Sequence, residues 1–296
     1  MTGILLLDKP EGLSSNAALQ RVKRAVGASK AGHVGSLDPL ATGMLPICLG
    51  EATKVAGEIV GGRKHYAFDV ALGTRTATGD REGAVIETAP VPALEPAAIE
   101  HELQRFCGRL LQVPPMYSAL KRAGQPLYRL ARAGIEVDRT AREITIESLS
   151  LVALRASVAS FETQCSKGTY IRVLAEDIAR ALGTCGHVIR LRRLCVAPFE
   201  REPMLGLEEV ESVCRAGRLP RLIAPDHALT GLPALELPQA AALRLCRGQA
   251  VAVSGVASGR VRLYDHRGRF LGLGAADGQG MVRPKRMFLV GEGGSG

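Results

Sequence analysis

The sequence predicts an α+β fold, in which a mixed, mostly antiparallel sheet with flanking helices is followed by a small β-barrel. Segments with the two-residue period of strands and segments with helical spacing alternate without a regular βαβ repeat. The chain has 296 residues, more than a typical single domain. Four prolines interrupt residues 219–238, as at a domain connection. We therefore expect a large N-terminal domain and a smaller C-terminal one.

The first elements alternate between strand and helix. A strand is expected over residues 3–7, and a helix over about 15–26, where apolar residues recur at helical spacing after capping serines. A second helix is expected over 51–60. The segment between the two helices is predicted to be a long structured loop, because residues 32–43 are rich in Gly, Pro and Ser.

The middle of the chain contains the clearest strand signal. Residues 65–72 place Tyr66, Phe68, Val70 and Leu72 on one face, which is the period of a half-buried strand. Further strands are expected near 84–87, 109–113, 143–153 and 157–165, and further helices near 96–106, 171–182 and 207–216.

The C-terminal part is predicted to be a small basic β module. A short helix over 239–247 precedes Gly-separated β runs at 249–253, 259–265, 269–274 and 281–290. From residue 235 onward there are nine basic and four acidic residues. A small basic barrel is a common way to hold nucleic-acid backbone, although a solvated β appendage that stabilises or dimerises the protein is also compatible with this pattern.

The charge and cysteine content limit the class of protein. The chain has 38 Lys and Arg against 29 Asp and Glu, and thirty of the basic residues are Arg. A polyanionic partner explains this excess, and so does GC-rich coding bias. The seven cysteines form no CxxC pair, and no apolar run reaches the roughly 18 residues of a membrane span. We therefore expect a cytoplasmic protein with reduced thiols.

One loop concentrates groups that can perform chemistry. Residues 31–43 place His33 and Asp38 in a glycine-rich segment, and Pro39 biases Asp38 towards an extended backbone that projects its side chain. This is a suitable position for a catalytic carboxylate. An Asx-type turn at an Asp-Pro pair is the structural alternative, and residue types alone do not decide between them.

Several sequence blocks together form a recognisable pattern. The longest is Gly35-Ser-Leu-Asp-Pro-Leu-Ala-Thr-Gly-Met-Leu45, continued by Gly50-Glu-Ala-Thr-Lys54. The others are 3–10, 14–16, 116–121, 165–172 and 187–194. In this order, across nearly the whole catalytic region, the blocks resemble the bacterial tRNA pseudouridine-55 synthase family. The C-terminal module resembles the family's PUA-like domain in size, basicity and β pattern.

The resemblance implies an enzyme that isomerises uridine 55 in the T loop of tRNA to pseudouridine. It implies a catalytic domain over 1–220 with a thumb-like RNA-binding insertion at about 115–142, and a PUA-like domain over 235–292. No cofactor or metal is expected, which suits a sequence without a P-loop, a dinucleotide fingerprint or metal-ligand spacing. The partner is the tRNA T stem-loop, without a membrane or an obligatory protein partner, and a monomer is expected.

The resemblance also implies roles for seven residues. Asp38 matches the catalytic aspartate, and Arg172 matches the arginine that pairs with it, with Lys9 supporting the site. His33 matches the residue that fills the space of the flipped nucleotide. Tyr66, Tyr170 and Leu191 match substrate-contacting residues that stack on, touch or enclose the base.

Taken without the resemblance, these residues also have ordinary structural explanations. Tyr66 and Leu191 are then core residues, Arg172 is a structural ion pair and His33 is a satisfied loop histidine.

Two basic stretches are interpreted as surfaces that follow RNA backbone. One covers residues 121–142, with six basic and two acidic residues, and the other comprises Arg190, Arg192 and Arg193. A solvated helix face is the alternative for the first stretch. Two other functions stay open: a guide-RNA-dependent pseudouridine synthase inside a ribonucleoprotein, and a non-catalytic RNA-binding or tRNA-folding protein.

Overall fold

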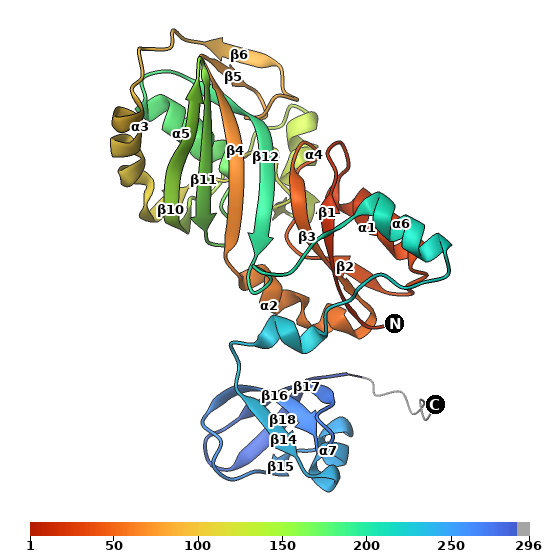
Figure 1. The fold of residues 1–296 in the computed structure, drawn as a ribbon. Coiled ribbons are helices and arrows are strands. Elements are labelled where there is room, and N and C mark those ends of the chain that lie inside the picture. Colours follow the sequence, from red (N-terminus) through yellow and green to blue (C-terminus); the bar gives the residue numbers. More distant parts are fainter. Residues whose placement is uncertain (289–296) are drawn as a thin grey trace.

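A nine-stranded sheet forms the centre of the larger domain in the computed structural model, which describes residues 1–288 (Figure 1). Its pairs are antiparallel except β1 with β13 and β3 with β12. The α+β prediction is therefore confirmed. In spatial order the strands are β13 (Leu205–Gly206), β1 (Gly3–Lys9), β3 (Thr42–Leu49), β12 (Gly186–Val196), β4 (Lys64–Leu72), β11 (Val158–Cys165), β10 (Arg142–Arg155) and β7 (Gly108–Gln112), and β2 (Ala31–His33) pairs with β3.

Strand β4 shows why these residues form a sheet with one buried face. Every second side chain from Lys64 to Leu72 is buried, as the alternation of the sequence predicts. Phe68 of this strand stacks on Phe161 of β11, with ring centroids 5.3 Å apart. The buried face of β4 therefore belongs to the main hydrophobic core.

The helices of this domain cover the sheet and its edges. Helix α5 buries Ile171, Leu174 and Ile178 against the sheet and packs on β12, while α1 and α6 pack on each other. All three lie where the sequence predicts helices. The helices are α1 (Ser15–Ala25), α2 (Ala56–Gly61), α3 (Pro96–Leu103), α5 (Ile171–Ala181) and α6 (Leu207–Arg215), with 3₁₀ turns at η1 (Gly50–Val55) and η2 (Gln104–Phe106).

Strands β2, β3 and β12 of the central sheet differ from the sequence prediction. The segment between the first two helices is not only a loop, because β2 and β3 occupy part of it. Nearly every side chain of β3 is buried, so the strand lacks the alternation that identifies a half-exposed strand. Strand β12 carries arginines on a largely buried segment and was not predicted, since charges obscured its apolar pattern.

The segment 115–142, predicted as a thumb-like insertion, contains only short elements. They are β8 (Lys121–Arg122), β9 (Gln125–Pro126) and α4 (Leu127–Arg132). A second small hairpin lies near the end of the sheet and consists of β5 (Thr74–Thr76) and β6 (Val85–Thr88). Both hairpins adjoin the site described below.

The C-terminal domain is a five-stranded, curled half-barrel sheet (Figure 1). Its order is β14 (Ala234–Leu237), β16 (Gly259–Asp265), β17 (Phe270–Ala276), β18 (Met281–Met287) and β15 (Val251–Ala252), with α7 (Gln239–Cys246) packed against it. Strand β14 was not predicted. Residues 289–292 of the predicted domain, and the end of its last predicted strand, lie outside the described residues.

The two domains contact each other through apolar and polar groups, below α2 in the view of Figure 1. Leu273 and Phe288 join a hydrophobic cluster with residues of the larger domain, and η3 (Pro225–Leu229) lies between them. Lys54 donates to the carbonyl of Met287 at 2.7 Å. Within residues 1–288, none of the helices combines the length and apolar character needed to span a lipid bilayer.

Candidate active site

The loop between β2 and β3 presents Asp38. The backbone of Leu37 is fixed by Ser15, whose hydroxyl accepts from the Leu37 amide at 2.7 Å and donates to its carbonyl at 2.9 Å. The Ala41 amide donates to the Asp38 carbonyl at 3.0 Å, closing a turn. The start of α1 therefore holds this loop rigidly, and the Asp38 side chain is left 39% exposed.

Lys9 supports the same loop from inside the protein. Its side chain is fully buried, and its ammonium donates to the carbonyls of Leu13 at 2.6 Å, Pro10 at 2.9 Å and Pro39 at 3.2 Å. Burial lowers the pKa of Lys9 to about 8, against the opposing effect of the Asp38 charge. Lys9 thus connects the end of β1 to the residue that follows Asp38.

Arg172 contacts Asp38 directly. It lies in the first turn of α5, is 4% exposed, and its Nε is 2.9 Å from Asp38 Oδ2. Its other nitrogens donate to the carbonyls of Thr78 at 2.6 Å and Tyr117 at 2.7 Å. One guanidinium therefore joins the Asp38 loop, the β5–β6 hairpin and the 115–142 segment. A buried guanidinium that two carbonyls hold in place orients the carboxylate beside it.

Asp80 is a member of this network that the sequence analysis missed. Its carboxylate lies 3.8 Å from the Arg172 guanidinium. The same carboxylate accepts hydrogen bonds from the Thr78 hydroxyl at 2.6 Å and from the Glu82 amide at 3.1 Å. Nothing local distinguishes an Asp in a polar, Gly-containing turn from an ordinary turn residue. Its proximity to Arg172 comes from tertiary structure.

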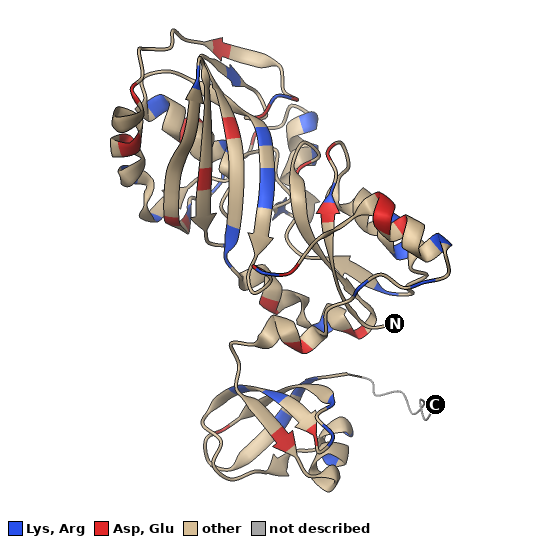
Figure 2. Ribbon diagram, in the orientation of Figure 1, with Lys and Arg blue, Asp and Glu red and all other residues tan. Residues whose placement is uncertain are grey.

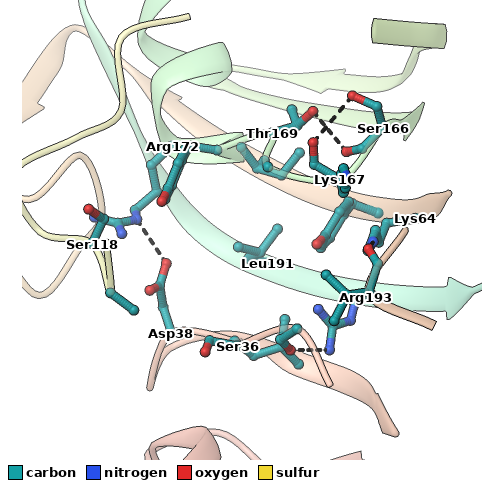
Figure 3. Close-up of a pocket in the computed structure, with 18 of the residues that line it drawn as sticks. Ser36, Asp38, Lys64, Ser118, Ser166, Lys167, Thr169, Arg172, Leu191 and Arg193 are labelled. Atoms are coloured by element: carbon teal, nitrogen blue, oxygen red, sulfur yellow. Dashed lines mark hydrogen bonds and ion pairs between the residues drawn. The ribbon is translucent and has the colours of Figure 1, made fainter. Parts of the chain in front are cut away.

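A pocket of about 320 Å³ opens beside Asp38 (Figure 3). Five of the seven predicted site residues line it: Asp38, Tyr66, Tyr170, Arg172 and Leu191. They come from four segments that are far apart in sequence. The pocket combines a carboxylate at one end with aromatic and aliphatic walls, which suits a flat, uncharged ring.

The walls of the pocket are positioned by the sheet and by α5. Tyr66 and Leu191 lie on adjacent strands and are 8% and 5% exposed, and burial raises the pKa of the Tyr66 hydroxyl. Tyr170 precedes α5, and the side chain of Gln112 both accepts from its amide at 2.8 Å and donates to its carbonyl at 3.2 Å. Both tyrosines therefore sit on rigid backbone.

His33 and Lys9 flank the pocket without lining it. His33 lies on β2 and is half-buried, and its Nδ1 makes no hydrogen bond within residues 1–288. Burial, with the Arg193 charge second, lowers the pKa of His33. The imidazole is accordingly neutral at pH 7.

The interpretation of Arg190, Arg192 and Arg193 as one RNA-facing surface is wrong. Strand alternation places Arg190 and Arg192 on the face opposite to Leu191, where they pair with Asp69 at 2.6 Å and Asp8 at 2.8 Å. Figure 2 shows basic residues as blue bands along the central sheet. Arg193 points inward, is 1% exposed and lines the pocket. A run of basic letters does not show this division, because it depends on which face of β12 is buried.

Comparisons with known families agree on both parts of the chain. Residues 23–171 match the N-terminal domain of the TruB family pseudouridylate synthases, and residues 172–229 match a tRNA pseudouridylate synthase B C-terminal domain. Residues 233–288 match the family described as pseudouridine synthase II TruB, C-terminal.

Individual relatives give the same result over nearly the full length. A protein named tRNA pseudouridine synthase B from Ectopseudomonas mendocina (strain ymp) is 48% identical over 98% of this chain and 96% of its own. One of the same name from Aromatoleum aromaticum is 49% identical over 96% and 92%. A solved H/ACA RNP bound to a substrate RNA containing 2'-deoxyuridine includes a chain with the same fold, with a TM-score of 0.73 at 20% identity over 97% of this chain and 85% of that one.

Proposed function

The chain belongs to the TruB family of pseudouridylate synthases and is an isomerase, and from this premise we propose that it converts uridine 55 in the T loop of tRNA to pseudouridine. The observation that carries the proposal is the carboxylate of Asp38, held by buried Arg172 at the edge of a ring-sized pocket. The names of the full-length relatives supply tRNA as the substrate.

The reaction rearranges one nucleotide and needs no second substrate. The bond between ribose C1' and uracil N1 breaks, a bond between C1' and C5 forms, and the proton lost from C5 balances the one gained at N1. Asp38 acts as the carboxylate that assists cleavage, by attack on the ribose, by attack on the ring, or by promoting elimination at the sugar. Arg172 keeps the carboxylate aimed at the pocket in each route.

The pocket implies that the target base leaves the RNA stack. A stacked uracil cannot reach Asp38, and extruding it costs a few kcal/mol. Stacking on Tyr66, worth about 1–3 kcal/mol, and apolar contact with Leu191 offset this cost. Tyr170 contacts the nucleotide from the position just before α5, and neutral His33 occupies the space that the base vacates.

Two regions bind the remainder of the tRNA. The 115–142 segment is joined to the pocket through the Tyr117 carbonyl and acts as a thumb on the stem-loop. The basic C-terminal domain, about 235–292, holds RNA backbone as a PUA-like domain, and residues 1–220 perform the chemistry. The enzyme acts as a cytoplasmic monomer without a protein partner.

The decisive experiment maps pseudouridine in unmodified tRNA after incubation with the purified protein and with its Asp38→Asn variant. We expect conversion at position 55 by the wild type alone, with folding and tRNA binding retained in the variant. Conversion that requires an added guide RNA would instead identify a ribonucleoprotein enzyme. Retained turnover in the variant would remove Asp38 from its role, and tRNA binding without any conversion would identify a binding protein.

A further inference from the structure

The pocket beside Asp38 contains more positive charge than the proposed chemistry uses. Its lining includes the four cations Lys64, Lys167, Arg172 and Arg193, and a single carboxylate, Asp38. Arg172 is paired with that carboxylate. Figure 3 shows this pair at one end of the pocket, with the other three cations at the opposite end. In the described part of the chain, none of those three lies within 4.0 Å of a carboxylate.

Lys64 is one of two buried cations among the three. It is 7% exposed, at the start of β4, and its ammonium donates to the carbonyls of Val60 at 2.6 Å and Gly62 at 2.5 Å, at the end of α2. An ammonium has three N–H groups, so one donor is left over among residues 1–288. Burial lowers the pKa of Lys64 to about 8, so it is mostly protonated at neutral pH.

Arg193 lies on the neighbouring strand and adds a second fixed charge. Its guanidinium donates to the carbonyls of Met44 at 2.7 Å and Gly35 at 2.9 Å, which fixes it behind the Asp38 loop. In the sheet, Arg193 is the register partner of Tyr66. Lys167 is exposed at the rim, in the loop before α5. The three charges therefore lie at one end of the pocket, two of them buried and one at its rim.

Buried charges in proteins are normally paired, because an unpaired buried cation costs several kcal/mol. Carbonyl oxygens satisfy the hydrogen-bonding capacity of Lys64 and Arg193 in part, but they leave the charge uncompensated. A neutral uracil ring does not compensate it either. An RNA substrate, however, carries one anionic phosphodiester for every nucleotide.

We propose that Lys64 binds a backbone phosphodiester of the RNA at or next to the target uridine, in a subsite completed by Arg193 and Lys167. This inference rests on the proposed function, since it assumes that the pocket accepts a nucleotide of RNA. Lys64 contacts the phosphate and Arg193 adds positive potential behind it. The subsite fixes the position of the nucleotide along the pocket while Asp38 acts at the other end.

The test combines a neutral phosphate with a neutral side chain. A set of tRNAs is assembled, each with one methylphosphonate, which lacks the phosphodiester charge. In each tRNA the methylphosphonate replaces a different one of the phosphates that flank the target uridine. Binding is measured in the Asp38→Asn background, to prevent turnover, with Lys64, Lys64→Met or Lys64→Gln. Gln removes the charge but retains two N–H donors on a side chain one bond shorter, so it covers the case in which the purely apolar Met disturbs the fold. Lys23→Met, on α1 outside the pocket, is the matched control.

With Lys64 present, we expect methylphosphonate at one position to weaken binding about tenfold, the size of one charge-assisted contact. In the Lys64 variants, unmodified tRNA should bind about tenfold more weakly and that methylphosphonate should have no further effect. The slope of log affinity against log salt should fall by about 0.7. Lys23→Met should leave the methylphosphonate effect unchanged.

Equal methylphosphonate effects with and without Lys64 would overturn the proposal. So would a Lys64 variant, tested with intact Asp38, that converts more slowly but binds tRNA as tightly as the wild type, since the lysine would then act on the chemistry. Conversion of unmodified tRNA by the wild type is scored separately. If the wild type does not convert unmodified tRNA, the proposed function is refuted. If it converts tRNA but the methylphosphonate effect does not depend on Lys64, only the phosphate-binding role of Lys64 is refuted.

Discussion

Replacing Arg172 by Met should destabilise the protein far more than replacing an exposed arginine on the same helix. Arg172 is 4% exposed and has three kinds of partner: the carboxylate of Asp38, the carboxylate of Asp80, and the carbonyls of Thr78 and Tyr117. Methionine fills much of the same volume but donates no hydrogen bond. The variant therefore leaves two carbonyls and a carboxylate pair without their cation.

The expected loss of stability is about 3–5 kcal/mol, the usual cost of removing one partner of a buried ion pair. Asp38 is 39% exposed, so water compensates part of its loss and moves the expectation towards the lower figure. The two orphaned carbonyls move it back towards the upper figure, because each costs about 1–3 kcal/mol where water cannot reach it. A domain stability of about 5–15 kcal/mol can absorb this loss, so the variant should still fold at room temperature.

The assay is urea unfolding followed by circular dichroism, with Arg180→Met as the control. Arg180 also lies on α5, but it is 69% exposed and pairs with the partly exposed Asp177 at 2.9 Å, so its removal should cost about 0.5 kcal/mol or less. Combining Arg172→Met with Asp38→Asn should recover part of the loss, because the pair is coupled. A difference between the two arginine variants of less than about 1 kcal/mol would refute the assigned network.

Three further predictions follow from other parts of the molecule. Because the folded-state pKa of Lys9 is about 8 and its ordinary value is 10.5, the unfolded chain binds more protons between these pH values. The free energy of unfolding of the wild type, measured in urea, should therefore rise from pH 8 to 10 relative to that of Lys9→Met. A difference between the two proteins that does not change with pH would contradict this. Gly43→Ala should destabilise the protein by more than about 2 kcal/mol, since Gly43 has φ +98° and a Cβ there would lie 2.1 Å from the Arg193 carbonyl oxygen. An unchanged thermal unfolding temperature would argue against this close contact between β3 and β12. The affinity for tRNA should fall steeply between 50 and 200 mM salt, as measured by filter binding, whereas a salt-independent affinity would remove the RNA-binding roles of the thumb and C-terminal domain.

Sequence patterns predicted those elements whose burial alternates or follows a helical stripe. Strand β4 and helix α5 both present one apolar face, and both lie within one residue of their predicted positions. Strands β3 and β12 were missed because burial on both faces, or charges on a buried strand, removes that local signature. The candidate residues came mainly from family resemblance, since an isolated Asp-Pro pair is compatible with an ordinary turn.

The sequence alone determined the class of fold, the order of most elements, the separate C-terminal β module and Asp38 as the leading catalytic candidate. Only the tertiary structure showed that Asp80 joins the pair of Asp38 and Arg172, and that Lys64 and Arg193 bring uncompensated charge into the same pocket. Local periodicity reports which face of an element is apolar. The partner of a buried charge depends instead on strand pairing and loop packing between residues far apart in the sequence, which no local pattern encodes.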